Sequence, residues 1–379
     1  MQINKNNKLS IKVNVKGEDG LTPICKHFGT CGGCKLQHLN KASYNQYKKE
    51  IVQTACEKNK LNVFEILEPI TLPQQSRRRC KFIAQKLKSK TVIGFRKSKS
   101  HEVVGITECY VILPEMVKLL KPLQNLCHTL LANKQEAEIY VSHTEGLTDV
   151  LIDLGKVEKF LTYEERESFA VIAKNANIAK LSLKTKTMTD LLFMHTQPIV
   201  KFNNVPVNVH SRCFLQASAE ADEVLQQTLK NLLSDLKVKK IADLFCGRGT
   251  FSFAFDSHIK VDGFEADKEA LLALNESAKK YKPNVKGHFV NLYQEPIITD
   301  KLNAYDAIVL DPPRDGALKQ CEEIATSKVK HVVYISCNPF TFARDAKKLQ
   351  EGGYKMNAIQ PVDQFLWSSH IEVIVHFEK

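Results

Sequence analysis

The sequence contains no long apolar run. No stretch reaches the roughly 18 apolar residues that a membrane-spanning helix needs, and the opening residues, MQINKNNKLSIKVNVKGEDG, include no apolar signal segment. We therefore expect a cytoplasmic protein without membrane association. Its 379 residues, of which 43% are hydrophobic, are enough for two or three domains with real cores.

Acidic residues are scarce in the front part of the chain. Residues 1–213 contain 33 Lys and Arg against 19 Asp and Glu, whereas residues 214–379 contain 21 against 23. Much of the excess lies in residues 76–101, SRRRCKFIAQKLKSKTVIGFRKSKSH, where cations alternate with apolar residues as in a strand. Because the second part is near neutral, this density favours binding of a polyanion such as nucleic acid over a merely solvated face.

A disulfide scaffold is not expected, although the chain has 11 cysteines, because no secretion signal is present. Cys25, Cys31 and Cys34 form a C-x5-C-x2-C pattern within CKHFGTCGGCKLQHL, and three thiolates at this spacing are typical of a metal site. His27 or His38 could complete a zinc site there.

The second part of the chain alternates strand-like and helix-like segments. The apolar segments IADLFCGRG, VDGFEAD, AYDAIVLDPPR and KHVVYISCNP are separated by helical patterns such as KEALLALNESAKKY. This alternation predicts an α/β domain with a parallel sheet covered by helices. The last two segments, YKMNAIQPVDQF and SHIEVIVHFEK, have almost nothing between them, which predicts a terminal hairpin.

The loop DLFCGRGTF lacks the third glycine of a dinucleotide-binding fingerprint, because Ser252 stands at that position. A nicotinamide enzyme is therefore disfavoured. Gly247 and Gly249 nevertheless allow the backbone to approach a ligand closely. Glu265, twenty-two residues after Asp243, ends the next strand, where a carboxylate can accept hydrogen bonds from both ribose hydroxyls of an adenosine group. The pattern predicts a nucleoside cofactor.

Two further predicted strands end in residues that could bind a ligand or react with one. VLDPPRDG places Asp311 before two prolines, where it could bond a planar amide or a base edge, or simply cap the turn. YISCNP places Cys337 where a strand opens into a loop at Pro339. A free cysteine is usually a small core residue, but ligands in parallel α/β sheets bind just outside these strand ends. Cys337 is therefore a candidate nucleophile.

Five motifs of the chain resemble, in their order, those of the S-adenosylmethionine-dependent RNA uracil-C5 methyltransferases. They are FLQAS, DLFCGRGTF, VLDPPRDG, YISCNP and SHIE. CKHFGTCGGCKLQHL and the later ITECY resemble the iron-sulfur site of the branch that modifies 23S ribosomal RNA. The resemblance covers nearly the whole chain from Pro23 onward. It implies a class I methyltransferase domain over residues 214–379, with a Rossmann-like, mostly parallel seven-stranded sheet. An N-terminal α+β iron-sulfur and RNA-binding domain would span residues 23–213, after a short polar segment, residues 1–22.

The resemblance also implies roles for single residues. Cys337 would be the nucleophile that adds to carbon 6 of uracil, and Glu372 the base that removes the proton from carbon 5. Asp311 would lie close to the target base. A [4Fe-4S] cluster would be held by Cys25, Cys31, Cys34 and Cys109. S-adenosylmethionine would be bound by Gln216, Phe245, Gly247, Gly249, Thr250, Glu265, Asn291 and Asp311.

Two positions depart from the family pattern. Thr250 stands where asparagine is frequent, and FLWSSHIE replaces the more usual Phe-Pro-His before Glu372, which affects the shape of the base pocket. We expect a monomer that acts on ribosomal RNA, with transfer RNA as the alternative. Cytosine methylation would require a cysteine on the DPP loop, which DPPRDG lacks. A non-catalytic RNA-binding metal protein would not be expected to retain the complete set of catalytic residues.

Overall fold

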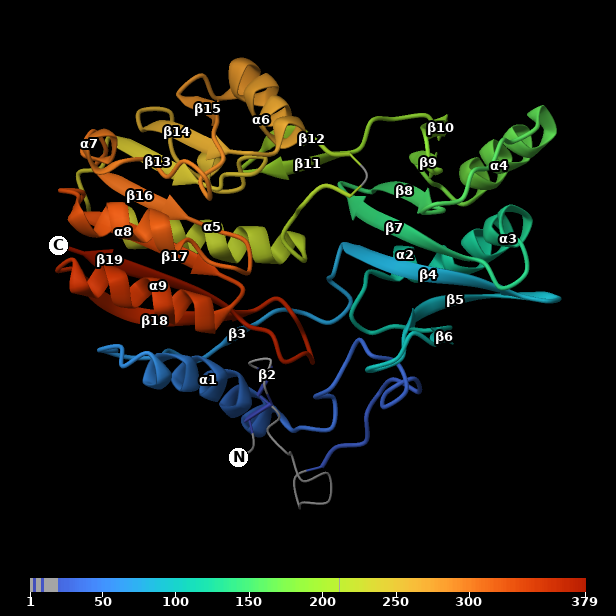
Figure 1. Cartoon of the computed structure of the whole chain (residues 1–379), viewed down its shortest axis with the longest axis horizontal. Coiled ribbons are helices and arrows are strands. Elements are labelled where there is room, and N and C mark those ends of the chain that lie inside the picture. Colours follow the sequence, from blue (N-terminus) through green and yellow to red (C-terminus); the bar gives the residue numbers. More distant parts are fainter. Residues whose placement is uncertain (1–2, 5–7, 10–19, 211) are drawn as a thin grey trace.

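A computed structural model describes residues 3–4, 8–9, 20–210 and 212–379. These residues form two units side by side, each built on one large sheet (Figure 1). The predicted polar segment 1–22 lies mostly outside the described residues, apart from the paired strands β1 (Ile3–Asn4) and β2 (Lys8–Leu9) and residues 20–22. None of the helices in the described ranges combines the length and the apolar character that crossing a membrane requires.

The first unit is an α+β layer with a seven-stranded sheet in the order β10-β9-β8-β7-β4-β5-β6. All neighbouring pairs are antiparallel except β8 and β9. Alternate residues of β7, such as Ile139 and Val141, are buried against the helices, as expected for a sheet with one covered face. The elements are β4 (Arg79–Leu87), β5 (Lys90–Arg96), β6 (Val103–Gly105), α2 (Pro114–Lys118), α3 (Leu120–Leu130), β7 (Glu136–Thr144), β8 (Leu147–Asp153), α4 (Tyr163–Asn175), β9 (Lys180–Lys184) and β10 (Thr189–Met194).

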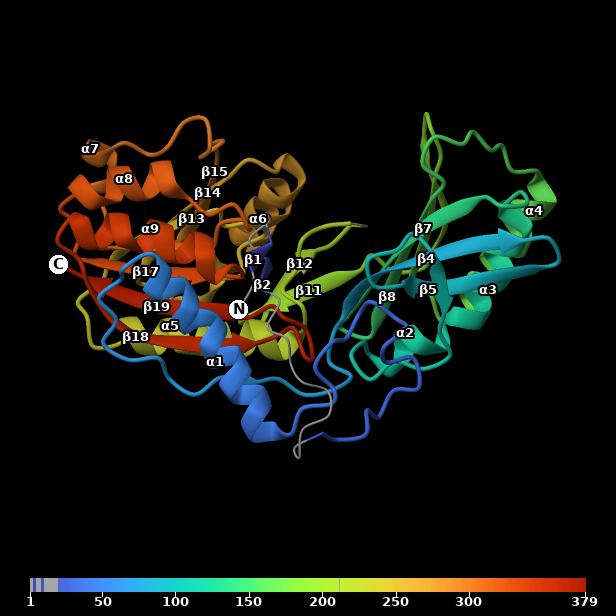
Figure 2. The same cartoon turned by 60° about the horizontal axis from the view of Figure 1, so that its bottom comes forward.

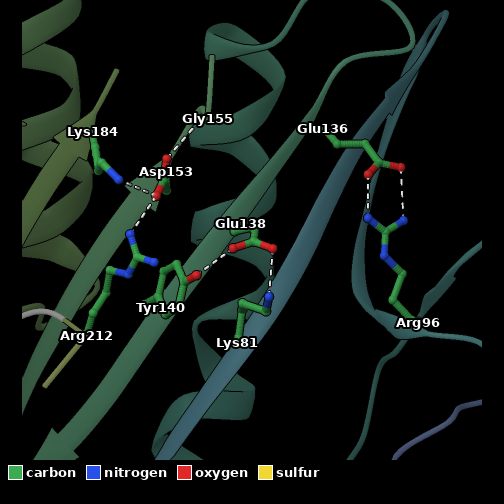
Figure 3. A network of polar contacts seen from close by, with 9 residues as sticks. All are labelled: Lys81, Arg96, Glu136, Glu138, Tyr140, Asp153, Gly155, Lys184 and Arg212. Carbon is green, nitrogen blue, oxygen red and sulfur yellow. Dashed lines mark hydrogen bonds and ion pairs between the residues drawn. The ribbon is translucent and has the colours of Figure 1, made fainter. Parts of the chain in front are cut away.

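The uncovered face of this sheet carries paired charges (Figure 3). Lys81 on β4 lies 2.6 Å from Glu138 on β7, which also accepts a hydrogen bond from the Tyr140 hydroxyl. Arg96 on β5 makes a two-pronged contact with Glu136. Part of the predicted basic face is therefore neutralised by carboxylates of a neighbouring strand that sequence analysis did not pair with it.

The second unit contains an eight-stranded mixed sheet in the order β15-β14-β13-β16-β17-β19-β18-β3. The first five strands are parallel, and β19 runs antiparallel to β17 and β18, which confirms the predicted terminal hairpin. The sheet has one strand more than the seven expected, because β3 from the front part pairs with the outer edge of β18. The strands are β3 (Ile70–Thr71), β13 (Lys240–Leu244), β14 (Lys260–Glu265), β15 (Val285–Phe289), β16 (Ala307–Leu310), β17 (His331–Ser336), β18 (Lys355–Asp363) and β19 (Glu372–Glu378).

Helices cover both faces of this sheet. One core joins the sheet to α1 (Lys41–Lys58), α7 (Thr299–Leu302), α8 (Leu318–Thr326) and α9 (Pro339–Glu351). The other joins it to α5 (Ala219–Leu233), the short 3-10 helix Ser252–Ala254, α6 (Lys268–Tyr281) and the hairpin β11 (Ile199–Phe202) and β12 (Val205–Asn208). Helix α9 starts directly after the loop at Cys337, because Asn338 caps it and Pro339 occupies its first position.

The packing divides the chain differently from the expected domains 23–213 and 214–379. Helix α1 lies beside β18 and α9 (Figures 1 and 2), and its apolar residues Ile51 and Val52 are buried in the core of the second sheet. The hairpin β11–β12 also packs in the second unit. Residues 41–71 and 199–208 thus belong structurally to the second sheet, because that sheet offers the apolar surface that covers them.

A buried ion pair fastens α1 to the segment that connects β18 and β19. The Lys48 ammonium lies 2.7 Å from an Asp363 oxygen, and both side chains have no exposed surface. Lys48 also donates to the carbonyl of His370 at 2.5 Å. The Tyr44 hydroxyl donates to the second Asp363 oxygen and accepts from the Trp367 amide. The position of residues 363–370 therefore depends on α1.

We expect Lys48→Ala to lower the free energy of unfolding by about 3–5 kcal/mol, because it leaves the Asp363 charge buried and unpaired. Urea denaturation followed by circular dichroism measures this change. Lys49→Ala is the matched control, since Lys49 pairs with Glu68 at the surface and such pairs contribute about 0–1 kcal/mol. Equal losses in the two variants would contradict the stabilising role of the buried pair.

Candidate active site

A cavity of about 870 Å³ lies at the carboxyl ends of the parallel strands and extends to the first unit. Such a volume suits a ligand the size of a nucleoside derivative. Of the site residues predicted from sequence, all except Gly249 line it. The structure therefore gathers residues from Cys25 to Glu372 around one space, which is the arrangement expected of a site for two ligands.

The glycine loop after β13 bends the backbone around this cavity. Phe245, Gly247 and Gly249 all have positive φ angles, of 64°, 54° and 95°. A Cβ atom on Gly249 would lie 2.6 Å from the Phe253 ring, so this glycine is required for packing and does not face the cavity. Gly247 has open space around it. Its N–H donates to Glu265 at 3.0 Å, which joins the loop to the end of β14.

Glu265, Asn291 and the aromatic pair of Phe245 and Tyr293 surround one end of the cavity. One Glu265 oxygen accepts from the Ala266 and Asp267 amides, and the other accepts from Gly247, so the carboxylate is held in a fixed orientation. A fixed carboxylate beside an aromatic ring fits the ribose and adenine of an adenosine group. The residues present therefore fit S-adenosylmethionine. Thr250 lines the same end of the cavity.

Four of the side chains that line the cavity form a continuous hydrogen-bonded chain. The Gln216 amide donates to Asp311 at 3.1 Å. The Gln364 amide donates to Gln216 at 2.8 Å and to Glu372 at 2.7 Å. Asp311 and Glu372, which are 61 positions apart in the numbering, are thus connected through two amides.

Burial makes the carboxylates of this chain weak acids. It raises the pKa of Glu372 to about 8. Burial, together with the charges of Glu372 and Asp243, also raises the pKa of Asp311 well above its usual range. Glu372 Oε1 has no hydrogen-bond partner among the described residues, so it is available to a ligand. Two neighbouring carboxyl groups that resist ionisation are typical of acid-base sites.

Cys337 faces these carboxyl groups. Burial, and then the charges of Glu372 and Asp311, raises the pKa of the Cys337 thiol to about 12, while Arg314 acts in the opposite direction. Arg314 also lies 2.7 Å from His370, and burial and this cation lower the pKa of His370 to about 4. Burial thus opposes ionisation of the thiol, and Arg314 is a cation that favours it; Arg79 also interacts with the Cys337 charge.

Sequence analysis missed Arg314 and Gln364. Arg314 lies inside the motif VLDPPRDG, so its charge next to two prolines was an available signal. Gln364 stands near the end of the predicted strand segment YKMNAIQPVDQF, which carries no functional motif at this position, and only its three-dimensional contacts reveal it.

Cys25, Cys31, Cys34 and Cys109 line the part of the cavity that belongs to the first unit. They come from two segments that are joined by hydrogen bonds: the Thr107 amide donates to His27 Nε2 at 3.1 Å, and the Lys26 amide donates to Glu108 at 2.9 Å. Burial raises the pKa of the Cys34 thiol to about 12, and the neighbouring thiols add to this. As placed, no three His, Cys, Asp or Glu side chains of the described residues are arranged to hold a metal ion.

Comparison with known proteins agrees with this geometry. Residues 277–379 match the model of the tRNA (uracil-5-)-methyltransferase family. An uncharacterized RNA methyltransferase from Brucella melitensis is 36% identical over 361 residues, which cover 94% of this chain and 84% of the relative. The chain belongs to the RNA uracil-C5 methyltransferase family. Like the family, it is an enzyme that uses S-adenosylmethionine.

Two other relatives extend the comparison. The 23S rRNA (uracil(1939)-C(5))-methyltransferase of Aliivibrio salmonicida is 29% identical over 380 residues, covering 97% of this chain and 85% of that protein. The crystal structure of the Pyrococcus abyssi tRNA (uracil-54, C5)-methyltransferase with S-adenosyl-L-homocysteine aligns with a TM-score of 0.70 at 19% identity, over 92% of this chain and 86% of that one. This likeness confirms the class I methyltransferase fold.

We expect Glu372→Gln to stabilise the protein at alkaline pH. The folded state raises the pKa of Glu372 from near 4.5 to about 8, so stability from this group is fully present below pH 4.5 and is lost as the pH rises through 8. The variant should therefore exceed the wild type by roughly 2 kcal/mol or more above pH 8 and match it near pH 4. Urea titrations at the two pH values measure the difference, with the exposed Glu57→Gln as control. A difference that does not grow with pH would contradict the burial of an unpaired carboxyl.

Proposed function

We propose that the enzyme methylates carbon 5 of a specific uridine in RNA through a covalent bond between Cys337 and carbon 6. The observation that carries this proposal is the common cavity of Cys337, Asp311 and Glu372 beside the glycine loop. A nucleophile, a base and an adenosine-sized space at one sheet edge are what this reaction needs.

The reaction follows from the chemistry of uracil, whose carbon 5 is a poor nucleophile. The Cys337 thiol loses its proton to solvent, the thiolate adds to carbon 6, and the electrons of the carbon 5–carbon 6 double bond move toward the carbonyl oxygen at carbon 4. S-adenosylmethionine, which Phe245, Glu265 and Asn291 would hold, would supply the methyl group to carbon 5 and would keep the electrons of the broken sulfur–carbon bond. Glu372 removes the remaining proton from carbon 5, and the sulfur–carbon 6 bond breaks with return of its electrons to Cys337.

The site residues suit these steps. A pKa of about 8 places Glu372 near the pH at which a general base is most effective. Arg314 counters the two carboxylates and favours the Cys337 thiolate. The Arg79 guanidinium carbon lies 4.6 Å from the centre of the Phe214 ring. Both residues line the cavity, and Phe214 is 63% exposed. Aromatic rings and guanidinium groups are the surfaces on which unstacked RNA bases lie.

We expect Cys337→Ala to abolish both methylation and covalent adduct formation, because the nucleophile is lost. Glu372→Gln should still form the adduct but should release methylated RNA at least about 100-fold more slowly, because the proton remains on carbon 5. Denaturing gels with radiolabelled RNA show the adduct as a band of reduced mobility. Cys321→Ala, a change in the core away from the cavity, is the control. Methylation at the normal rate by Cys337→Ala would contradict the assignment.

We propose ribosomal RNA as the preferred substrate. Support comes from the relative named for position 1939 of 23S rRNA, which aligns over 97% of this chain, and from the resemblance of the four-cysteine motifs to the iron-sulfur site of the ribosomal branch. Transfer RNA is the alternative, because the matching family model and the aligned crystal structure are named for it. A cytoplasmic location agrees with both substrates.

We further propose that Cys25, Cys31, Cys34 and Cys109 bind a [4Fe-4S] cluster. Four thiols from two linked segments around one cavity are the ligand set that such clusters use. The cluster would fasten the loop at Cys25 to the segment at Cys109 and so keep the first unit in place over the catalytic cavity.

Protein purified anaerobically should contain about four iron and four sulfide ions per chain and should be brown. Cys31→Ser should lose most of the iron, whereas Cys127→Ser, which changes a buried cysteine of α3, should keep it. Elemental analysis and absorption spectra test this. Stoichiometric zinc in place of iron would contradict the proposal.

A further inference from the structure

Gln364 links Gln216 to the buried carboxyl group of Glu372 and uses both the nitrogen and the oxygen of its side-chain amide. It follows the last residue of β18 and is 6% exposed. Its side-chain nitrogen donates to Gln216 Oε1 at 2.8 Å and to Glu372 Oε2 at 2.7 Å. Its side-chain oxygen accepts from the Ala217 amide at 2.8 Å. An amide has two hydrogens to donate and an oxygen to accept, so glutamine matches all three partners.

The direction of these hydrogen bonds orients the neighbouring amide. Gln216 Oε1 accepts from Gln364, so Gln216 Nε2 faces Asp311 and donates to it. Without Gln364, Gln216 Oε1 would lose its donor, and the orientation of the amide would depend on Asp311 alone. Gln364 thus reinforces the orientation in which Gln216 Nε2 meets Asp311.

The same contacts select one oxygen of Glu372. Gln364 occupies Oε2, whereas Oε1 is buried and has no hydrogen-bond partner among the described residues. We propose that Gln364 is a positioning residue that keeps Oε2 of Glu372 as an acceptor and leaves Oε1 as the atom that takes the proton from carbon 5. This inference rests on the proposed function, because it assigns a role to Glu372 as the base.

Helix α1 holds the backbone on either side of Gln364 in place. Asp363, the residue before Gln364, is held by Lys48 and Tyr44, and Lys48 also binds the carbonyls of Phe365 and His370. The backbone on both sides of Gln364 is therefore fixed. The side-chain amide of Gln364 loses little conformational entropy when it donates to Glu372.

Electrostatics gives Gln364 a measurable effect on pH dependence. The hydrogen bond from Gln364 and the charge of Arg314 lower the pKa of Glu372, while burial raises it to about 8. Asp311 and Cys337 are the other titratable groups that interact with Glu372 across the cavity. Without the Gln364 donor, one of the two effects that lower the pKa of Glu372 is lost, and burial raises that pKa further. Glu372 should therefore ionise at higher pH.

The test is Gln364→Leu, studied in single turnover with the RNA transcript that the wild type methylates. With a 5-fluorouridine version of this transcript, which cannot lose fluorine from carbon 5, we expect adduct formation at close to the wild-type rate. With ordinary transcript, release of methylated RNA should slow by about tenfold or more, and the acid limb of its pH profile should move to higher pH. Gln360→Leu is the matched control, because Gln360 lies on β18, four residues before Gln364, and its side-chain amide donates to backbone carbonyls of Glu68 and Pro361.

The outcomes separate the two proposals. If the wild type forms no adduct with 5-fluorouridine RNA, the proposed function fails. If the wild type forms it and Gln364→Leu releases product at the normal rate with an unchanged pH profile, the role of Gln364 is refuted. Calorimetry with S-adenosylhomocysteine verifies that the variant is folded. Should Gln364→Leu not fold, Gln364→Glu, which keeps the shape and the acceptor for Ala217, should show the same upward shift of the acid limb, and an unshifted limb would refute the role.

Discussion

The hydrogen-bonded chain from Asp311 through Gln216 and Gln364 to Glu372 is the constraint on which the site depends. The buried carboxyl group of Glu372 and the half-buried groups of Asp311 and Cys337 would repel one another if all were ionised. The amides supply donors without adding charge, and Arg314 is the cation that acts on the thiol and on Glu372. The cavity thus holds a carboxyl group whose pKa is raised to about 8, and a thiol whose ionisation is opposed by burial and by two carboxylates and favoured by Arg314.

The two middle members of this chain, Gln216 and Gln364, are held in place by residues from the front of the sequence. Arg78, just before β4, forms a buried ion pair with Asp222 at 2.6 Å, and it also donates to the carbonyls of Gln216 and Ala217. Lys48 of α1 holds the backbone beside Gln364. The front part of the chain therefore helps to position the polar side chains of the cavity, through Arg78 and through helix α1, which packs on the second sheet.

Sequence patterns predicted what depends on local order. Strand ends, turn glycines and the terminal hairpin follow from residues close together in the chain, and Cys337, Asp311 and Glu265 do lie around one cavity. Patterns could not predict contacts that depend on distant partners. Gln364 meets Gln216 across 148 positions, and the apolar stripe of α1 could have covered either sheet. The basic face of β4 likewise gave no sign of Glu138, since the strand register that pairs them is absent from the sequence.

The most direct test of the central claim is nucleoside mass spectrometry of separated ribosomal and transfer RNA from a strain with and without this gene. The account predicts that one 5-methyluridine disappears from ribosomal RNA and returns when the wild-type gene is restored. Its disappearance from transfer RNA alone would keep the chemistry and change the substrate. Unchanged 5-methyluridine in both RNA fractions would contradict the account.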